Sequence, residues 1–117
     1  MDNLKHITLT DFGTQNGDIM ATLKLSYQCF GQPLFSAPIV LVNHALTGNS
    51  NVAGKGGWWT ELVGANKVID TNNYTVLAFN IPGNGYDGFI IDNYKAFVAR
   101  DIAKIFLLGL ELSLIHI

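Results

Sequence analysis

The sequence predicts an α/β fold in which an antiparallel edge hairpin precedes parallel strands joined by crossover helices. Three observations predict it: apolar residues alternate near the N-terminus, two later apolar runs are continuous, and the spacing becomes helical towards the C-terminus. The 117 residues, 49% of them hydrophobic, can bury one core, so we expect one small domain, or part of a larger one, over residues 1–117 and no disordered chain.

The N-terminal segment has the pattern of two half-exposed strands. Apolar residues alternate with polar ones over Leu4–Phe12 and again over Ile19–Cys29. The polar positions of the second strand, among them Ser26 and Gln28, are expected to face water. Between the strands, Gly13–Gly17 supplies the Gly and Asn residues that a tight turn needs, which predicts an antiparallel hairpin.

Two later segments are apolar at consecutive positions, Ile39–Val42 and Tyr74–Phe79. This pattern is typical of strands that are covered on both faces. About 30 residues separate the two strands, which is enough for a right-handed crossover with one helix. We expect that helix at Trp58–Val63, since its apolar residues are four apart and Gly64 follows.

From Asp92 onward the spacing predicts a long helix, with Asp92 or Asn93 as its N-cap. The residues expected on its apolar side are Tyr94, Phe97, Val98, Ile102, Ile105, Phe106 and Leu112, and those on its polar side are Lys95, Arg100, Asp101 and Lys104. The most apolar stretch, Ile105–Ile117, is shorter than the roughly 20 residues that cross a membrane. We therefore expect a buried segment there. A covered parallel sheet needs more strands than these, so the chain is expected to be the first part of a domain.

Composition and charge exclude several classes of function. A net charge of −2 and 14% charged residues, without a basic run, argue against an electrostatic nucleic-acid binder. The single Cys29 cannot form an internal disulfide and is expected to be a small apolar strand residue. His6, His44 and His116 lack metal-ligand spacing, so no metal site is expected. The N-terminus has no secretory signal, which favours a cytoplasmic location.

The loop Asn43–Gly48 follows a predicted buried strand, at the edge of the sheet where ligands bind in open α/β folds. Backbone N–H groups in such a loop can stabilise an oxyanion without a titratable side chain. The alternative interpretation is that His44 is a buried histidine with its hydrogen bonds satisfied and that Gly48 only makes a turn.

Two other features of the sequence relate to known binding or catalytic motifs. Gly83–Gly88 fits G-x-G-x-x-G after a strand, which is the context of a nucleotide phosphate loop. Phe89–Ile91 separates these glycines from the predicted helix, which favours a Gly-rich connection instead. No serine has the G-x-S-x-G context of a nucleophile elbow, and the proximity of Ser50 to His44 is interpreted as chance. No catalytic serine, acid or base can be assigned within the chain.

Several segments at characteristic intervals carry a family resemblance: His44-Ala-Leu-Thr-Gly48, Trp58-Trp59, Leu62-Val-Gly64, Lys67-Val-Ile-Asp-Thr71 and Tyr74 to Asn80. Together they resemble the N-terminal part of homoserine O-acetyltransferases, which are members of the α/β-hydrolase superfamily. The resemblance runs from about Tyr27 to Leu112. Within it, Phe97–Asp101 followed by Leu107–Leu110 is similar to the family's helix before the nucleophile strand.

The resemblance implies the N-terminal part of an α/β-hydrolase fold, truncated before the nucleophile elbow, and acetyl transfer from acetyl-CoA to L-homoserine in methionine biosynthesis. Leu46 would supply a backbone N–H to the oxyanion hole, and His44, Ala45, Thr47 and Gly48 would shape that substrate loop. The catalytic serine, aspartate and histidine would lie beyond residue 117. Acetyl-CoA would be a co-substrate, with no bound cofactor, and the parent protein would be a homodimer.

Asn80–Gly88 departs from the family's usual glycine pattern, which leaves succinyl-CoA as donor and serine as acceptor open. The alternatives are an esterase or amidase on the same scaffold, a small nucleotide-binding module at Gly83–Gly88, and a non-catalytic structural protein if the chain ends at Ile117. Ser113–Ile117 lacks the polar turn expected after the helix. An uncovered apolar helix face and an unpaired strand edge predict that the 117 residues alone are inactive and poorly soluble.

Overall fold

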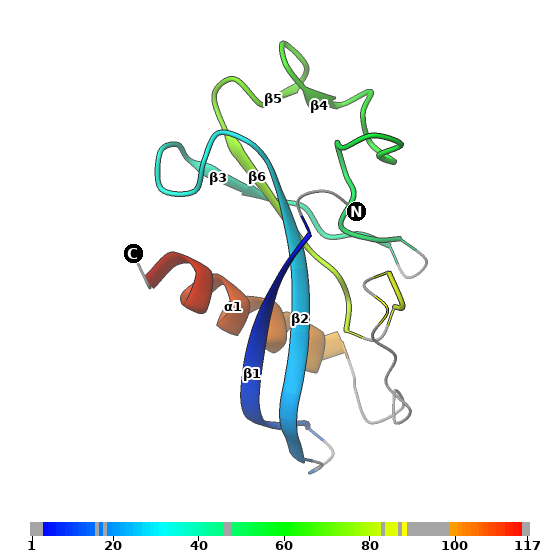
Figure 1. Cartoon of the computed structure of the whole chain (residues 1–117), viewed down its shortest axis with the longest axis vertical. Coiled ribbons are helices and arrows are strands. Elements are labelled where there is room, and N and C mark those ends of the chain that lie inside the picture. Colours follow the sequence, from blue (N-terminus) through cyan, green and yellow to red (C-terminus); the bar gives the residue numbers. More distant parts are fainter. Residues whose placement is uncertain are drawn as a thin grey trace. The chain divides into compact units, whose positions relative to one another are not determined.

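The computed structural model describes residues 4–15, 17, 19–45, 48–82, 84–86, 88 and 99–115 (Figure 1). Its elements are β1 Lys5–Gly13, β2 Ile19–Gly31, β3 Ile39–Leu41, β4 Val63–Gly64, β5 Ile69–Asp70, β6 Thr75–Phe79 and α1 Ala99–Ile115. The chain divides into two compact units. The first consists mainly of Tyr27–Phe79, and the second consists of Lys5–Ser26 and Asn80–Ile117, so β2 contributes to both.

The predicted N-terminal hairpin is confirmed. β1 and β2 are neighbouring strands joined by a tight turn, in which Gly17 N donates to Thr14 O at 3.0 Å (Figure 1). Leu23 and Leu25 of β2 are fully buried, as their alternation predicts. Ile19, at the start of the same alternating series, is 74% exposed. The rest of the unit does not cover this end of β2, although the alternating pattern extends to it.

The prediction that Ser26 and Gln28 face water is wrong, since both side chains are buried. In the second unit, Asn80 Nδ2 donates to Ser26 Oγ at 2.8 Å. In the first unit, Ser50 Oγ donates to Gln28 Oε1 at 2.6 Å. This part of β2 is therefore covered on both faces, and hydrogen bonds offset the cost of burying its polar side chains. Cys29, in the same part of β2, is half-buried and reduced.

The sheet of the first unit has β6 at its centre. Tyr27–Gly31 of β2 pairs antiparallel to β6, and β3 pairs parallel to it, with Leu41 opposite Leu77. All five residues of β6 are buried, which confirms the prediction of a strand covered on both faces. The same prediction is wrong for β3, whose Leu41 is 36% exposed, because β3 is the end strand of the described sheet.

The predicted helix at Trp58–Val63 is wrong. Only one hydrogen bond there, from Val63 N to Trp59 O, has helical spacing, whereas the amides of Trp58 and Trp59 donate backwards to Asn51 O and Val52 O. Val63 and Gly64 instead form β4, which pairs parallel to β5 in a separate two-stranded sheet. The buried core of this unit consists of Val42, Val52, Val63, Val76 and Ala78.

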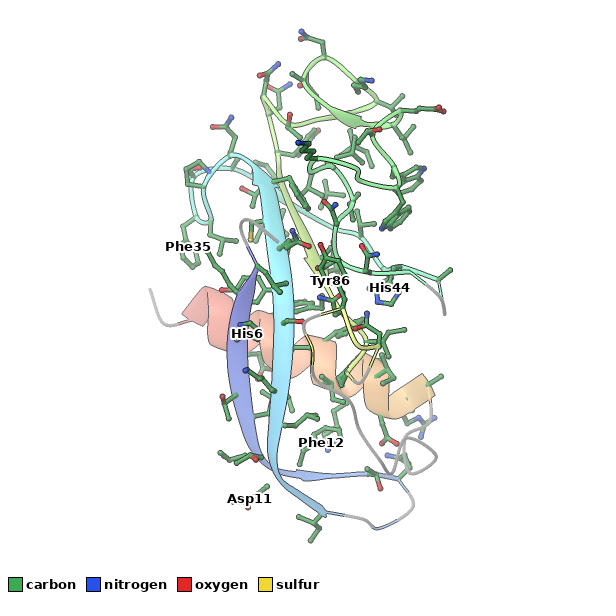
Figure 2. The ribbon with its side chains drawn as sticks, turned by 45° about the vertical axis from the view of Figure 1, so that its right-hand side comes forward. His6, Asp11, Phe12, Phe35, His44 and Tyr86 are labelled. Carbon is green, nitrogen blue, oxygen red and sulfur yellow. The ribbon has the colours of Figure 1, made fainter. Side chains whose placement is uncertain are left out.

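The predicted C-terminal helix is confirmed over Ala99–Ile115, and it packs against β1. Its proposed caps, Asp92 and Asn93, lie outside the described residues, as do Tyr94, Lys95, Phe97 and Val98. Ile105 and Phe106 are buried as predicted, whereas Leu107 in the same apolar stretch is 56% exposed. Lys104 lies 5.6 Å from the centroid of the Phe12 ring, which is labelled in Figure 2. Among the described helices, none is long and apolar enough to cross a membrane.

Asp101 corrects the prediction for the polar side of this helix. It was expected to face water, but its carboxylate is fully buried, and Oδ1 accepts a hydrogen bond from Gln15 N at 2.9 Å. Gln15 lies in the turn of the hairpin, so a carboxylate in the first turn of α1 binds the backbone of a segment 86 residues earlier.

Candidate functional site

The loop that follows β3 lies at the carboxyl end of a parallel strand, as expected for a ligand site. His44, labelled in Figure 2, is buried, and its Nδ1 is hydrogen-bonded to the Ala45 carbonyl oxygen. The same carbonyl accepts a hydrogen bond from Gly48 N at 2.8 Å, which closes a tight turn. Leu46 and Thr47 lie outside the described residues, so the oxyanion donor at Leu46 stays a prediction.

Glycine is the one residue type that this turn accommodates at position 48. A Cβ at this position would lie 2.8 Å from His44 Cβ and 3.2 Å from Ala45 O. Both neighbours belong to the turn itself, so a side chain at position 48 would force the turn open.

The segment after this turn is anchored by Ser50, which is fully buried. Its hydroxyl proton is directed to Gln28 Oε1 on β2. Asn49 Oδ1 accepts from Asn51 N at 2.8 Å, and Asn51 Oδ1 accepts from Gly54 N at 3.0 Å. Because Ser50 donates to Gln28, it is not activated as a nucleophile by His44, which agrees with the interpretation of that pair as chance.

Two adjacent tryptophans form a feature that the sequence reasoning missed by assigning them to a helix. The Trp58 and Trp59 rings are stacked, with centroids 5.4 Å apart and an interplanar angle of 17°. They are 43% and 37% exposed, and Trp58 Nε1 donates to Asn49 O at 2.9 Å. A pocket of about 330 Å³ is lined by Ala45, Gly48, Asn49 and Trp58. Gly56-Gly57 directly before the pair is the sequence signal that favours a loop over a helix.

Asp70, at the end of β5, organises the loop that leads into β6. Its Oδ1 accepts from the backbone N–H groups of Asn66 and Asn72, both at 3.0 Å, and its Oδ2 accepts from Asn73 Nδ2 at 3.2 Å. The hydrogen bonds from Asn72 and then Asn66 hold the pKa of this carboxyl below its ordinary value. Asp70 therefore has a structural function, and its carboxylate already binds the surrounding loop.

Among the described residues, Tyr27 also has a shifted pKa. Burial, with the Cys29 thiol as a smaller cause, raises the pKa of its hydroxyl. Its ring lies 5.8 Å from that of Phe79 across the β2–β6 pair. Tyr27 is therefore neutral at physiological pH and packs as part of the sheet.

The loop after β6 corresponds to the G-x-G-x-x-G match, of which Gly83, Asp87 and Phe89–Ile91 lie outside the described residues. In the described part, Asn84 N donates to Ile81 O, Gly88 N donates to Gly85 O, and Tyr86 N donates to Asn84 Oδ1. A phosphate-binding loop directs its backbone amides at the phosphate, whereas these three donate within the loop. This geometry favours the Gly-rich connection over a nucleotide site.

Three or more His, Cys, Asp or Glu side chains do not come together as a metal site anywhere in the described ranges. Of the three histidines, His116 lies outside those ranges. The loop after β3 thus offers backbone groups with an adjoining pocket, and the described ranges hold no cluster of metal-ligating side chains.

No family model matches the chain. It is 39% identical over 82 residues to a homoserine O-acetyltransferase of Haloferax volcanii, an alignment covering 62% of this chain and 20% of the relative. It is 35% identical over 95 residues to that of Haloarcula marismortui, covering 72% and 23%. The chain thus spans about a fifth of the length of the curated relatives it matches.

Solved structures show the same relationship. Homoserine O-acetyltransferase from Staphylococcus aureus superposes with a TM-score of 0.73 at 28% identity, covering 94% of this chain and 36% of that one. Esterase E22 superposes with a TM-score of 0.76 at 22% identity, covering 92% and 36%. The second likeness shows the fold alone. The chain therefore has part of an α/β-hydrolase fold, with a mixed sheet of the expected kind.

Proposed function

Because the chain is homologous to homoserine O-acetyltransferases, we propose that the protein containing it transfers an acetyl group from acetyl-CoA to L-homoserine. The observation that carries the proposal is the 39% identity over 82 residues. The nucleophilic serine, the acid and the base are proposed to lie outside these 117 residues. A cytoplasmic location and a homodimer are part of the same proposal.

Within that reaction, this chain would stabilise negative charge. Acyl transfer passes through a tetrahedral intermediate whose oxygen needs hydrogen-bond donors that are already in position. The Leu46 backbone N–H is the proposed donor. The position of the loop at the end of β3 supports this assignment, because ligands of open α/β sheets bind at the carboxyl ends of the strands.

Ester hydrolysis is the second candidate function, because the same fold also carries an esterase, E22. In that case the acyl group carried by the catalytic serine would be transferred to water and not to an amino acid. The two candidates share the oxyanion loop and differ only in the acceptor.

The test uses the complete protein, meaning the product of the whole reading frame that contains these residues. Thiol release from acetyl-CoA is followed with and without L-homoserine, and O-acetylhomoserine is identified by mass spectrometry. We expect release to depend on L-homoserine. Equal release without it, together with hydrolysis of p-nitrophenyl acetate, would favour the esterase. Parallel assays with succinyl-CoA and with serine identify the donor and the acceptor. A frame that stops at Ile117 would refute the proposal, since it holds no G-x-S-x-G serine.

The role of Leu46 is tested by replacing this leucine with its α-hydroxy acid analogue, which removes only the backbone N–H. Loss of one oxyanion donor lowers kcat by roughly 10²- to 10³-fold. Leu46→Ala keeps the N–H and is the matched control, with kcat expected near that of the native protein. An analogue as active as the control would remove Leu46 from the oxyanion hole.

A further inference from the structure

We propose that the pocket lined by Ala45, Gly48, Asn49 and Trp58 binds the uncharged pantetheine arm of the acyl-CoA donor, with Trp58 as its apolar wall. This proposal rests on the proposed function, since it assigns part of the donor to a particular surface. Trp58 would then act through binding and take no part in the chemical step.

Trp58 is prepared as a binding surface by its own contacts. Its indole N–H donates to Asn49 O, so the polar group of the side chain is already used and the ring orientation is set. Trp59 stacks against the ring, which supports it from one side. Trp59 does not line the pocket, whereas Trp58 does, so part of Trp58 remains available to a ligand.

The chemistry of the lining selects the neutral part of the donor. None of the described lining residues carries a charge, and Asn49 is the one among them with a polar side chain. A nucleotide phosphate or a zwitterionic amino acid placed there would be desolvated without an ion pair, which is costly. An amide-containing, otherwise apolar arm can pack on the indole and hydrogen-bond to an amide side chain.

The size of the pocket agrees with a part of the donor. Ligand pockets commonly measure about 300–1,000 Å³, and this one, at about 330 Å³, lies at the lower end. It adjoins the turn that contains Ala45 and Gly48, so a thioester arm bound along Trp58 would reach the loop after β3. The pocket therefore fits the segment of the donor nearest the acyl group better than the adenine nucleotide at its far end.

The first test is kinetic, in the complete protein. Trp58→Ala is expected to raise the KM for acetyl-CoA about tenfold, the equivalent of one well-packed aromatic contact, while kcat and the KM for L-homoserine change little. Trp58→Phe retains a flat ring and should recover most of the affinity. Val68→Ala is the control, because Val68 is 80% exposed in the same unit and does not line the pocket. An unchanged KM for acetyl-CoA in an active Trp58→Ala protein would overturn the proposal and leave the proposed function intact.

The second test measures binding directly and needs no turnover. Residues 1–117 contain two tryptophans, both in this pair, so the difference in emission between the native protein and Trp58→Phe reports on the stacked pair, because removing one indole also changes the emission of the other. We expect S-acetylpantetheine to change that difference signal and adenosine 3′,5′-bisphosphate to leave it unchanged. The reverse result would assign the pocket to the nucleotide and overturn the proposal. A response to S-acetylpantetheine in a protein that fails to acetylate L-homoserine would keep the pocket and refute the proposed function.

Discussion

At the scale of single residues, Gln28 and Ser50 form a buried pair that connects β2 to the segment carrying the candidate site. Neither residue has a sequence pattern that distinguishes it from a surface position. Their burial makes the hydrogen bond important, because removing one partner leaves the other desolvated. The pair therefore contributes to stability and also holds the loop in place.

Ser50→Ala is expected to lower the free energy of unfolding of the complete protein by about 1–3 kcal/mol, since it removes the donor to Gln28 Oε1. Ser36→Ala is the matched control, because Ser36 makes a similar bond to Pro33 O at an exposed position. That change should stay within about 0.5 kcal/mol. Urea titration measures the free energy of unfolding of both variants. Equal losses of stability would show that the burial of Ser50 does not make its hydrogen bond more important than that of Ser36.

The lowered pKa of Asp70 predicts that the stability of the protein depends on pH. Its pKa is lower in the folded chain than in the unfolded one, so its stabilising effect is present above the unfolded-state pKa and is lost as the pH falls through the folded-state value. Between about pH 5 and pH 2, the native protein should lose more stability than Asp70→Asn, which cannot titrate. Urea titrations of both proteins across this range measure the difference. Parallel curves would mean that the hydrogen bonds from Asn66 and Asn72 do not depend on the charge.

At the scale of elements, β6 depends on close approach of the chain at its first residue. Gly31, the last residue of β2, has φ +84°, and a Cβ there would lie 2.5 Å from the Tyr74 carbonyl oxygen. This carbonyl accepts a hydrogen bond from Gln32 N, and Thr75 Oγ1 donates to Gln32 O at 2.8 Å. The end of β2 and the start of β6 are thus bonded to each other directly.

Gly31→Ala should destabilise the complete protein by more than Gly56→Ala does. Both glycines have a positive φ, which costs a substituted alanine roughly 1–2 kcal/mol. Gly56 has open space around it, whereas Gly31 would meet backbone atoms, which adds about 1–3 kcal/mol. Thermal or urea unfolding of the two variants compares them. Equal losses of stability would show that the backbone at the contact between β2 and β6 can move to accommodate a Cβ without an energetic penalty.

At the scale of the whole molecule, the 117 residues taken alone leave apolar side chains uncovered. In the first unit Leu41, Trp58, Trp59 and Tyr74 are each more than a third exposed, and in the second unit Leu107 is 56% exposed. β3 ends the described sheet with one edge unpaired. Open edges next to exposed apolar groups favour association between chains.

We therefore expect the isolated 117-residue polypeptide to aggregate and to lack acetyl transfer. Light scattering and size-exclusion chromatography at increasing concentration measure association, and the thiol-release assay measures activity. The complete protein, purified in the same buffer, is the control. A monodisperse isolated chain that melts cooperatively and turns over substrate would contradict this expectation.

The sequence by itself determined the elements whose signals are local. Period-two alternation predicted β1 and β2, the continuous apolar run predicted β6, and helical spacing predicted α1. The short motifs at His44–Gly48 and Trp58-Trp59 also indicated the family from the sequence alone. These properties depend on neighbours along the chain, which a sequence displays directly.

The tertiary structure alone decided which polar residues are buried and how the crossover runs. Ser26 and Asp101 are buried because their partners, Asn80 and Gln15, come from segments 54 and 86 residues away. Trp58 and Trp59 leave the helical path because their amides bond to the loop at Asn51 and Val52. Local propensity cannot reveal these outcomes, because the energy of a buried polar group depends on a distant partner that only the folded chain supplies.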